Sequence, residues 1–341
     1  MDPKVLSTRY QPDLDSELRS MVGDSSLPLY HMMRYHLGWV DASGQNRPEK
    51  GGKLLRPGLC LLSCESVGGD WHRALPAAAA LELMHNFTLI HDDIEDEDRE
   101  RRGIATVWHV WGQPQAINVG DAMHILSRLA LFKLEEKGVA ASTVLRAARL
   151  MDETCLSLCE GQYLDISYEE RIDIGIDDYM EMIKGKTADL FACSLKLGAI
   201  VGTDDEQIIE GLNRFGKNLG MAFQIQDDVL GIWGEDSKTG KSSSSDIMKK
   251  KKTLPTIYGI EKTEPEQRSE LLRVYAQPKV SDEDTPVVLK ILNDVNARKY
   301  AEETASEYCD MALVELEKID IPYSSKDDLS SLARSLIGRE Y

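Results

Sequence analysis

Two clusters of acidic side chains are the residues of this sequence with the clearest capacity for chemistry. Residues 91–96 read His-Asp-Asp-Ile-Glu-Asp, and residues 224–228 read Gln-Ile-Gln-Asp-Asp. Both follow apolar stretches, where carboxylates rarely gather unless a cation compensates their charge. Asp92 and Asp96 are four residues apart, so on a helix both side chains point the same way and repel each other. The two clusters therefore predict a divalent metal site.

The ligand types favour Mg²⁺ over Zn²⁺. Neither cluster has a cysteine or an imidazole cage beside it, and oxygen ligands suit hard cations. His91 could be a ligand, but we interpret it as a core residue or as one that supports the ligands without binding the metal. Mg²⁺ keeps several waters and completes its shell with substrate phosphates, so the clusters indicate a site that binds a diphosphate through metal ions. The alternative is that they are solvated acidic helix ends, since 58 of the 341 residues are acidic.

Composition and charge exclude several classes of protein. With 42% hydrophobic and 29% charged residues, the chain has the composition of a soluble globular protein. A net charge of −18 argues against a nucleic-acid partner, because phosphate contacts need a basic surface. The apolar stretch 74–84 is too short to cross a bilayer, and the N-terminus carries no secretory signal. Six cysteines in a chain of this length do not form a disulfide framework, so we expect a cytoplasmic protein with no stable membrane anchor.

Helical periodicity extends over nearly the whole chain. Apolar residues recur at three- and four-residue spacings in residues 77–90, 118–137, 142–163, 176–198, 206–230 and 289–319. No Asn-Gly or Asp-Gly hairpin signal lies between alternating strands, so no sheet is expected. No linker divides the chain, and we expect one all-α domain over residues 1–341. Helices of roughly 15–25 residues are long enough to enclose a deep pocket.

Basic side chains gather in several short segments of the chain. They occur in residues 51–57 (Gly-Gly-Lys-Leu-Leu-Arg-Pro), 101–103 (Arg-Arg-Gly), 186–187 (Lys-Thr), 240–241 (Gly-Lys) and 246–255 (Asp-Ile-Met-Lys-Lys-Lys-Lys-Thr-Leu-Pro). The serine run 242–245 lies between an acidic cluster and four lysines, which suggests a mobile lid. Taken singly, each segment is as well explained by a turn or by solvated charge. An acidic protein that binds an anionic substrate, however, must concentrate its cations locally.

The acidic clusters and these basic segments together resemble the trans-isoprenyl diphosphate synthase (polyprenyl synthetase) family. The matching segments occur in the family's order and span roughly residues 45–260. The resemblance implies a single bundle of long, mostly antiparallel helices around a deep central cavity, usually in a homodimer. It also implies a chain-elongating prenyltransferase, in which three Mg²⁺ ions help an allylic diphosphate to ionise and the double bond of isopentenyl diphosphate attacks the resulting cation. Proton loss completes the reaction.

The resemblance also assigns roles by position. The metal-binding residues are Asp92, Asp93, Asp96, Asp227 and Asp228. The site for isopentenyl diphosphate comprises Lys53, Arg56, His85 and Arg102. Contacts with the allylic diphosphate come from Arg101, Lys186, Thr187, Gln224, Lys241 and Lys251. The residues expected to be catalytic are Asp92, Asp227, Lys186 and Lys241. Three basic groups and an imidazole can hold a diphosphate without metal, since arginine binds phosphate bidentately.

The second acidic cluster departs from the family at its fifth position, where Gly231 replaces the usual Asp. We expect this to matter little if Asp227 makes the main metal contact, and we expect Gly231→Asp to be tolerated. Residues 227–235 also loosely resemble the second metal motif of class I terpene cyclases, which ionise the same allylic substrates. Those enzymes need no isopentenyl site, so the basic residues favour elongation over cyclisation. A non-enzymatic regulatory subunit is a third alternative, but such a chain would be expected to lose a motif that this one keeps.

Product length in the family depends on the residues four and five positions before the first acidic cluster, here Thr88 and Phe87. An ideal helix places Thr88 about 40° and Phe87 about 140° from Asp92 around its axis. The helical wheel therefore supports Thr88, and only the resemblance supports Phe87. Small Thr88 beside bulky Phe87 predicts a product of fifteen or twenty carbons, with geranylgeranyl diphosphate favoured over farnesyl diphosphate. Met84, one turn further from the cluster, is the expected next obstruction to the growing chain.

Overall fold

The secondary structure of the chain is helical almost throughout. The computed structural model describes residues 3–47, 52, 54–169, 171–234, 244–277, 279–281 and 283–338. Within these ranges, the only departures from helix, turn and loop are one pair of two-residue strands and an isolated bridge between Val40 and Asn46. This confirms the all-α class. None of the described helices is both long and apolar enough to cross a membrane.

The chain divides into two compact units, and each holds one of the acidic clusters. The first unit comprises Met1–Asp152, Ser194–Glu210 and Ile321–Ser325. The second comprises Glu153–Cys193, Gly211–Asp320 and Lys326–Tyr341. The single domain expected over residues 1–341 stays a prediction.

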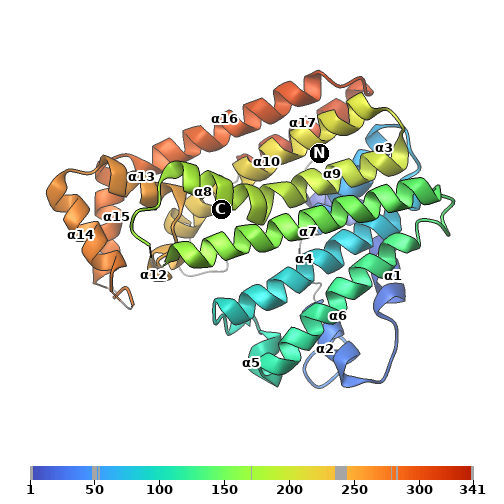
Figure 1. The fold of residues 1–341 in the computed structure, drawn as a ribbon, viewed down its shortest axis with the longest axis horizontal. Helices are drawn as coiled ribbons and strands as arrows, with labels where there is room; N and C mark the ends of the chain where they lie inside the picture. The colour runs from blue at the N-terminus through green and yellow to red at the C-terminus, as the bar shows by residue number, and fades with distance from the viewer. Residues whose placement is uncertain are drawn as a thin grey trace. The chain divides into compact units, whose positions relative to one another are not determined.

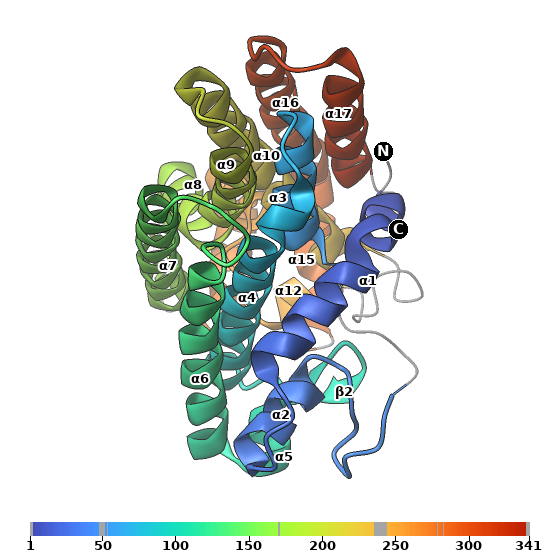
Figure 2. The ribbon, with the colours of Figure 1, turned by 90° about the vertical axis from the view of Figure 1, so that its right-hand side faces the viewer.

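The helices of the first unit pack around α4, whose buried side chains form much of its core. They are α1 (Pro3–Val22), α2 (Pro28–His36), α3 (Leu55–Ser66), η1 (Trp71–Ala74), α4 (Leu75–Glu95), α5 (Val107–Trp111), α6 (Gln113–Phe132), the beginning of α7 (Ala141–Glu169), the end of α9 (Asp189–Gly202), and the first residues of α10 (Glu206–Trp233) and α17 (Tyr323–Ile337). Helices α4 and α6 lie side by side (Figures 1 and 2). Their close approach depends on Gly120 of α6, where a Cβ atom would lie only 2.2 Å from Nε2 of His91. The interpretation of His91 as a packing residue agrees with this contact.

A short hairpin follows α4 and turns two arginines back toward it. Strand β1 (Glu100–Arg101) pairs antiparallel with β2 (Ile104–Ala105), so that Arg101 lies opposite Ile104. The turn residues Arg102 and Gly103 both have left-handed backbones, with φ of 53° and 72°, as the tightest hairpin turns require. The expectation of no strand pairing was wrong here, because Arg-Gly is not among the usual turn signals. The hairpin fixes the directions in which Arg101 and Arg102 leave the backbone.

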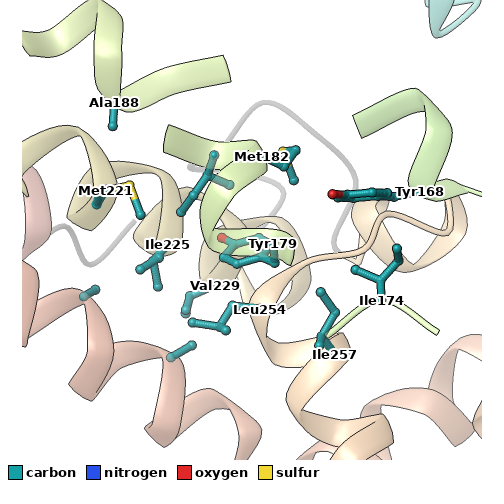
Figure 3. Close-up of a cluster of buried hydrophobic side chains, with 13 residues drawn as sticks. Tyr168, Ile174, Tyr179, Met182, Ala188, Met221, Ile225, Val229, Leu254 and Ile257 are labelled. Carbon is teal, nitrogen blue, oxygen red and sulfur yellow. The ribbon is translucent and has the colours of Figure 1, made fainter. Parts of the chain in front are cut away.

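The second unit is built around α10 and a cluster of buried apolar side chains. Its remaining elements are the end of α7, α8 (Ile176–Ile183), the π-helical segment η2 (Lys184–Ala188), the start of α9 (Asp189–Gly202), α10 (Glu206–Trp233) from Gly211 onward, α12 (Ser245–Met248), α13 (Leu254–Lys262), α14 (Pro265–Tyr275), α15 (Asp284–Asp294), α16 (Ala297–Glu317) and most of α17 (Tyr323–Ile337). Figure 3 shows Tyr179 of α8 beside Val229 and Leu254 in this cluster.

Two of the expected continuous helices are interrupted. Residues 176–198 contain the π-helical segment Lys184–Ala188, and residues 289–319 are divided between α15 and α16. The second break lies at Asn296, whose backbone is left-handed with φ 55°, a conformation that asparagine tolerates better than most residues. The apolar periodicity continues across both breaks, which is why it predicted one helix in each case.

Candidate active site

The end of α4 concentrates carboxylates where a helix least tolerates them. Asp92 and Asp93 lie in its last turn, and Asp96 is its C-cap residue. The last turn contains no basic residue, although the C-terminal end of a helix carries partial negative charge and favours cations. Compensation comes from the hairpin. Nε of Arg101 donates to Oδ1 of Asp93 at 2.6 Å, and its Nη2 donates to Oδ2 of Asp92 at 3.3 Å.

Arg101 leaves this negative charge only partly compensated. Asp93 is buried, and its Oδ2 atom has no hydrogen-bond partner. Burial raises the pKa of the Asp93 carboxyl to about 6, although Arg101 acts in the opposite direction. A buried carboxylate oxygen without a donor is costly. A divalent cation coordinated at this helix end would satisfy it, so these residues fit Mg²⁺.

A separate group of basic side chains gathers around His85, which lies two turns before Asp92 on α4. Nη1 of Arg56 lies 3.1 Å from Nε2 of His85, and because a guanidinium can only donate, the imidazole is the acceptor. Desolvation by burial, together with the charges of Arg56, Arg102 and Arg101, holds the pKa of His85 well below its usual range. His85 is therefore neutral at pH 7, and the proton is on its Nδ1 atom.

Gly52 explains how Arg102 can approach this group. A Cβ atom at position 52 would lie 2.6 Å from Nη2 of Arg102, so glycine leaves room for the guanidinium in this position. Arg102 and Gly52 line a cavity of about 130 Å³ together with Glu82 and Asn86. Desolvation lowers the pKa of Arg102, and the negative charge of the buried Glu82 carboxylate opposes this shift. Lys53, which was expected here, lies outside the described residues.

Sequence reasoning missed three basic residues of this neighbourhood. Arg19 and Arg47 line the same cavity, and His36 of α2 is buried near Arg101 and Arg102. Burial and these arginines lower the pKa of His36 to about 3. The signal that could have identified His36 is its place on the apolar face of α2, with Met32 and Met33. Nothing in the local sequence singles out Arg19 or Arg47, because the cavity brings together residues that are far apart in the chain.

The neutral state of His85 predicts a specific pH dependence of stability. Below pH 6.5 the unfolded chain binds a proton at His85 that the folded protein does not. Keeping His85 neutral therefore costs nothing above about pH 6.5. Below that pH it lowers the free energy of unfolding by about 1.4 kcal/mol for each pH unit. The unfolding free energy of His85→Gln, measured with urea from pH 7.5 to 5, should fall less steeply than that of the wild type.

His36, Asp93 and Asp228 also titrate in this range, but they are present in both proteins and largely cancel in the comparison. His109→Gln, at an exposed position of α5 in the same unit, is the matched control and should show the wild-type pH dependence. Parallel curves for His85→Gln and the wild type would show that His85 is protonated in the folded protein.

In the second unit, the two adjacent aspartates of the second cluster have opposite environments. Asp227 is exposed, whereas Asp228 is buried. Both carboxylate oxygens of Asp228 accept hydrogen bonds: Oδ2 from the Tyr179 hydroxyl at 2.6 Å and the Leu254 amide at 3.4 Å, and Oδ1 from Nε2 of Gln224 at 2.9 Å. Burial and the nearby Asp246 carboxylate raise the pKa of Asp228 to about 7. These bonds tie α10 to α8 and α13, so Asp228 has a positioning role within the unit.

Lys186 reaches the same region through the π-helical segment. Gly185 of this segment packs against Gly161 of α7, where a Cβ atom would lie 2.2 Å from the Lys186 amide nitrogen. Extra residues in a helical turn often mark functional sites, and here the bulge points Lys186 toward Asp165, with which it forms an ion pair. Thr187 donates to Oε1 of Gln224 at 2.7 Å. A chain of hydrogen bonds therefore joins Thr187, Gln224 and Asp228.

The two remaining basic residues predicted here are less fully defined. Lys251 is half-buried, and its amide donates to the Asp246 carbonyl at 2.9 Å. Lys241 and the first half of the serine run lie outside the described residues, so the mobile lid stays a prediction.

The expectation that Gly231→Asp would be tolerated does not fit the structure. A Cβ atom at position 231 would lie 2.0 Å from Oδ2 of Asp246 and 2.5 Å from its Cγ. Any side chain at 231 would therefore displace the Asp246 carboxylate, and an aspartate would also add a second negative charge beside it. Tolerance was predicted from α10 alone, and sequence gave no sign that residue 246 returns to this helix.

The residues expected to set product length lie on different faces of α4. The Phe87 ring is 4.8 Å from that of His124 on α6 and 5.8 Å from that of His91, measured between centroids. Thr88 lies one turn before Asp92, and its hydroxyl donates to the His85 carbonyl at 2.8 Å. Met84 is buried. Phe87 therefore packs toward α6, while Thr88 shares the face of Asp92.

The predicted site residues thus form separate groups within the two units. Asp92, Asp93 and Arg101 form one group in the first unit, and Arg56, His85 and Arg102 form another. The second unit joins Thr187, Gln224 and Asp228. Across the part of the chain that the structure describes, no three His, Cys, Asp or Glu side chains are already grouped closely enough to hold an ion.

Comparisons with known proteins agree with this chemistry. Residues 38–292 match the polyprenyl synthetase family. The chain is 40% identical over 275 residues to the geranylgeranyl diphosphate synthase of Mycobacterium tuberculosis, covering 81% of this chain and 77% of that protein. It is 33% identical over 326 residues to the (2E,6E)-farnesyl diphosphate synthase of the same organism, covering 95% of this chain and 89% of that protein.

A solved structure shows the same likeness in three dimensions. The polyprenyl synthetase from Streptomyces coelicolor A3(2) superposes with a TM-score of 0.91 at 34% sequence identity, and the match covers 98% of this chain and 99% of that one. The family match extends over more than half of the chain, and the two mycobacterial relatives are prenyl diphosphate synthases. The chain belongs to the polyprenyl synthetase family and is a short-chain prenyltransferase.

Proposed function

We propose that this prenyltransferase condenses isopentenyl diphosphate with an allylic diphosphate and that its main product is geranylgeranyl diphosphate. The observation that carries the proposal is the presence of two different anion sites in the first unit. One combines carboxylates with Arg101, and the other, around Arg56, His85 and Arg102, is basic without any need for metal. A condensing enzyme needs both, because it must ionise one diphosphate and hold the other intact.

The allylic diphosphate would bind at the carboxylate site through Mg²⁺. The unpartnered Oδ2 of Asp93 and the acidic end of α4 support binding of a divalent cation there, with Asp92 and Asp96 as further ligands, and Asp227 would bind metal in the second unit. When bound, Mg²⁺ would supply Lewis-acid stabilisation of the departing diphosphate. Arg101, Lys186 and Lys241 would add fixed positive charge to the leaving group, and Thr187, Gln224 and Lys251 would orient it. Three ions remain the expected number.

Isopentenyl diphosphate would bind at the basic site. Lys53, Arg56 and Arg102 would carry the charge of the phosphates, and neutral His85 would present its Nδ1 proton to a phosphate oxygen. The neutral state of His85 matters because it keeps Arg56 in place as a donor. Geranylgeranyl diphosphate is favoured over farnesyl diphosphate by small Thr88 on the face of Asp92 and by the higher identity to the mycobacterial geranylgeranyl diphosphate synthase.

The direct test is incubation with isopentenyl diphosphate and, separately, allylic diphosphates of five, ten and fifteen carbons. Chromatography of the dephosphorylated products should show geranylgeraniol as the longest main product from each primer. A product formed equally well without isopentenyl diphosphate would favour cyclisation instead, and a chain inactive without a second subunit would support a regulatory role.

Removing Arg56 should separate the two substrate sites. Arg56→Ala is expected to raise KM for isopentenyl diphosphate at least tenfold, because a charge-assisted phosphate contact is worth about 1.5–3 kcal/mol. KM for the allylic diphosphate should change little. Steady-state kinetics with each substrate varied in turn measures both constants. Arg9→Ala, which removes a surface ion pair with Glu65, is the control, and a change confined to the allylic KM would mean that the two sites have been assigned the wrong way round.

A homodimer is the expected assembly, and α6 carries a surface suited to it. Ile117, Ile125, Leu129 and Phe132 are each between 42% and 54% exposed, and their spacing places them along one side of the helix. Asp121 interrupts this stripe between Ile117 and Ile125, but an exposed apolar patch of this kind often marks an interface. Ile125→Asp/Leu129→Asp should convert a dimer to a monomer in light scattering, whereas Val5→Asp, at an exposed position of α1, should not. An unchanged mass for the double variant would place the interface elsewhere.

A further inference from the structure

We propose that Asp246 supplies the carboxylate that position 231 lacks, so that Asp227 and Asp246 together face the metal in the second unit. The proposal rests on the Mg²⁺ dependence put forward above. It concerns a residue outside the acidic cluster itself, in a segment that sequence reasoning assigned to phosphate contacts through Lys251. Its basis is the position of the Asp246 side chain relative to α10.

The Asp246 carboxylate lies directly over Gly231. A Cβ atom built at Gly231 would overlap it, at 2.0 Å from Oδ2 and 3.1 Å from Oδ1. Gly231 is four residues after Asp227 in α10, so both positions are on the same face of the helix. The Asp246 carboxylate therefore takes the space that the side chain of an aspartate at 231 would fill, beside Asp227. Glycine at 231 makes room for it.

The backbone around Asp246 is fixed in this position. The Ser244 hydroxyl donates to the Ile232 carbonyl at 3.1 Å, which holds the start of α12 against the end of α10. Ile247 is completely buried and packs in one cluster with Ile232. The Asp246 carbonyl also accepts from the Lys251 amide at 2.9 Å. Asp246 itself is only 9% exposed. Contacts of the residues before and after it therefore fix its position over Gly231.

The alternative partner for Asp227 within the cluster is Asp228, and its geometry argues against that role. Both of its oxygens already accept hydrogen bonds from Tyr179, Gln224 and the Leu254 amide. Turning Asp228 toward a metal would leave three buried donors without an acceptor, which is unfavourable. Asp246, in contrast, occupies the space left by the missing side chain of Gly231. Asp228 instead connects α10 to α8 and α13.

A carboxylate exchange tests the proposal without measuring activity. Mn²⁺ binding in the presence of inorganic diphosphate is followed by electron paramagnetic resonance for the wild type, Asp246→Ala and Gly231→Asp/Asp246→Ala. Asp246→Ala should lower Mn²⁺ affinity tenfold or more, as the loss of a residue that supports a metal site typically does. The exchange variant, which returns a carboxylate from position 231 into the vacated space, should recover most of this loss. Gly231→Asp alone should bind more weakly than the exchange variant, because Asp246 then opposes it.

Three comparisons keep the outcome decisive. Asp310→Ala, at an exposed position of α16, should bind Mn²⁺ like the wild type. Asp246→Asn preserves shape and replaces Asp246→Ala if that variant melts below the assay temperature. In the Asp227→Ala background, loss of Asp246 should have a much smaller further effect, because the two carboxylates share one ion.

The results separate this proposal from the function on which it rests. Wild-type affinity in Asp246→Ala, or an exchange variant no better than Asp246→Ala, would overturn the role of Asp246 and leave the prenyltransferase site intact. A wild-type protein that binds no Mn²⁺ with diphosphate would overturn the proposed metal dependence as well.

Discussion

Asp227→Ala is expected to lower turnover about a hundredfold or more while leaving the melting temperature within a few degrees of the wild type. Asp227 is exposed, so its removal leaves no buried group without a partner. Its charge would act on the transition state through bound Mg²⁺, where one such group is worth about 3–4 kcal/mol. Asp92→Ala should reduce turnover similarly, although release of Arg101 will also perturb the hairpin. Steady-state kinetics at saturating Mg²⁺ and calorimetry on the same samples measure both effects.

Asp228→Ala provides the contrast, because it changes the neighbouring residue. It would leave the buried Tyr179 hydroxyl and the Gln224 amide without their acceptor, at about 1–3 kcal/mol for each group. We therefore expect a marked loss of stability, with turnover reduced mainly through misplacement of α8 and Gln224. Near-normal turnover in Asp227→Ala would remove it from the metal site. A stable Asp228→Ala with a hundredfold loss of turnover would instead restore Asp228 as a direct ligand.

The burial of Asp228, but not of Asp227, could have been predicted from the apolar periodicity of α10. Met221, Ile225, Val229 and Ile232 form the buried face of α10, and Asp228 lies on that face at three- and four-residue spacings from Ile225 and Ile232. A carboxylate inside an apolar stripe is a signal of burial that was available in the sequence. Sequence reasoning grouped the two aspartates because they are adjacent, but adjacent helical residues point about 100° apart.

The elements that carry the first acidic cluster were largely predictable. Residues 77–90 were expected to be helical, and α4 extends this by two residues at its start and by one and a half turns at its end. The extension includes Asp92 and Asp93, whose acidic character masks the helical pattern. The hairpin was not predictable, because two-residue strands are too short to alternate and Arg102 adopts a left-handed backbone without the usual asparagine or aspartate.

The contacts that sequence could not supply are those between distant segments. Asp246 over Gly231 and Arg102 over Gly52 each depend on a glycine that yields space to a side chain from elsewhere in the chain. A glycine in a sequence can serve many purposes, so neither of these two contacts can be predicted from the residues around the glycine. The resemblance identified Gly231 as unusual, yet the reason for it becomes visible only once α12 has folded against α10.

Product length should respond in opposite directions to substitutions on the two faces of α4. Thr88→Phe places a large ring on the face of Asp92, one turn from the carboxylates, and should shorten the main product from twenty to fifteen carbons. Phe87→Ala removes the ring that packs against His124 and should lengthen the product by at least one five-carbon unit. The driving force is burial of the added chain, at about 0.8 kcal/mol per carbon. Chromatography of dephosphorylated products measures both changes.

The contacts of Phe87 make stability the necessary second measurement. Its ring packs against His124 and His91, so Phe87→Ala also creates a cavity and is expected to cost up to about 3–5 kcal/mol. Phe215→Ala, at a fully buried position of α10, is the matched control and should lose comparable stability with no change in product. If Phe87→Ala behaves like Phe215→Ala, Phe87 is a packing residue and Thr88 alone sets the length. If products lengthen, Phe87→Ala/Met84→Ala should lengthen them further, since Met84 is the next buried apolar side chain toward the start of the helix.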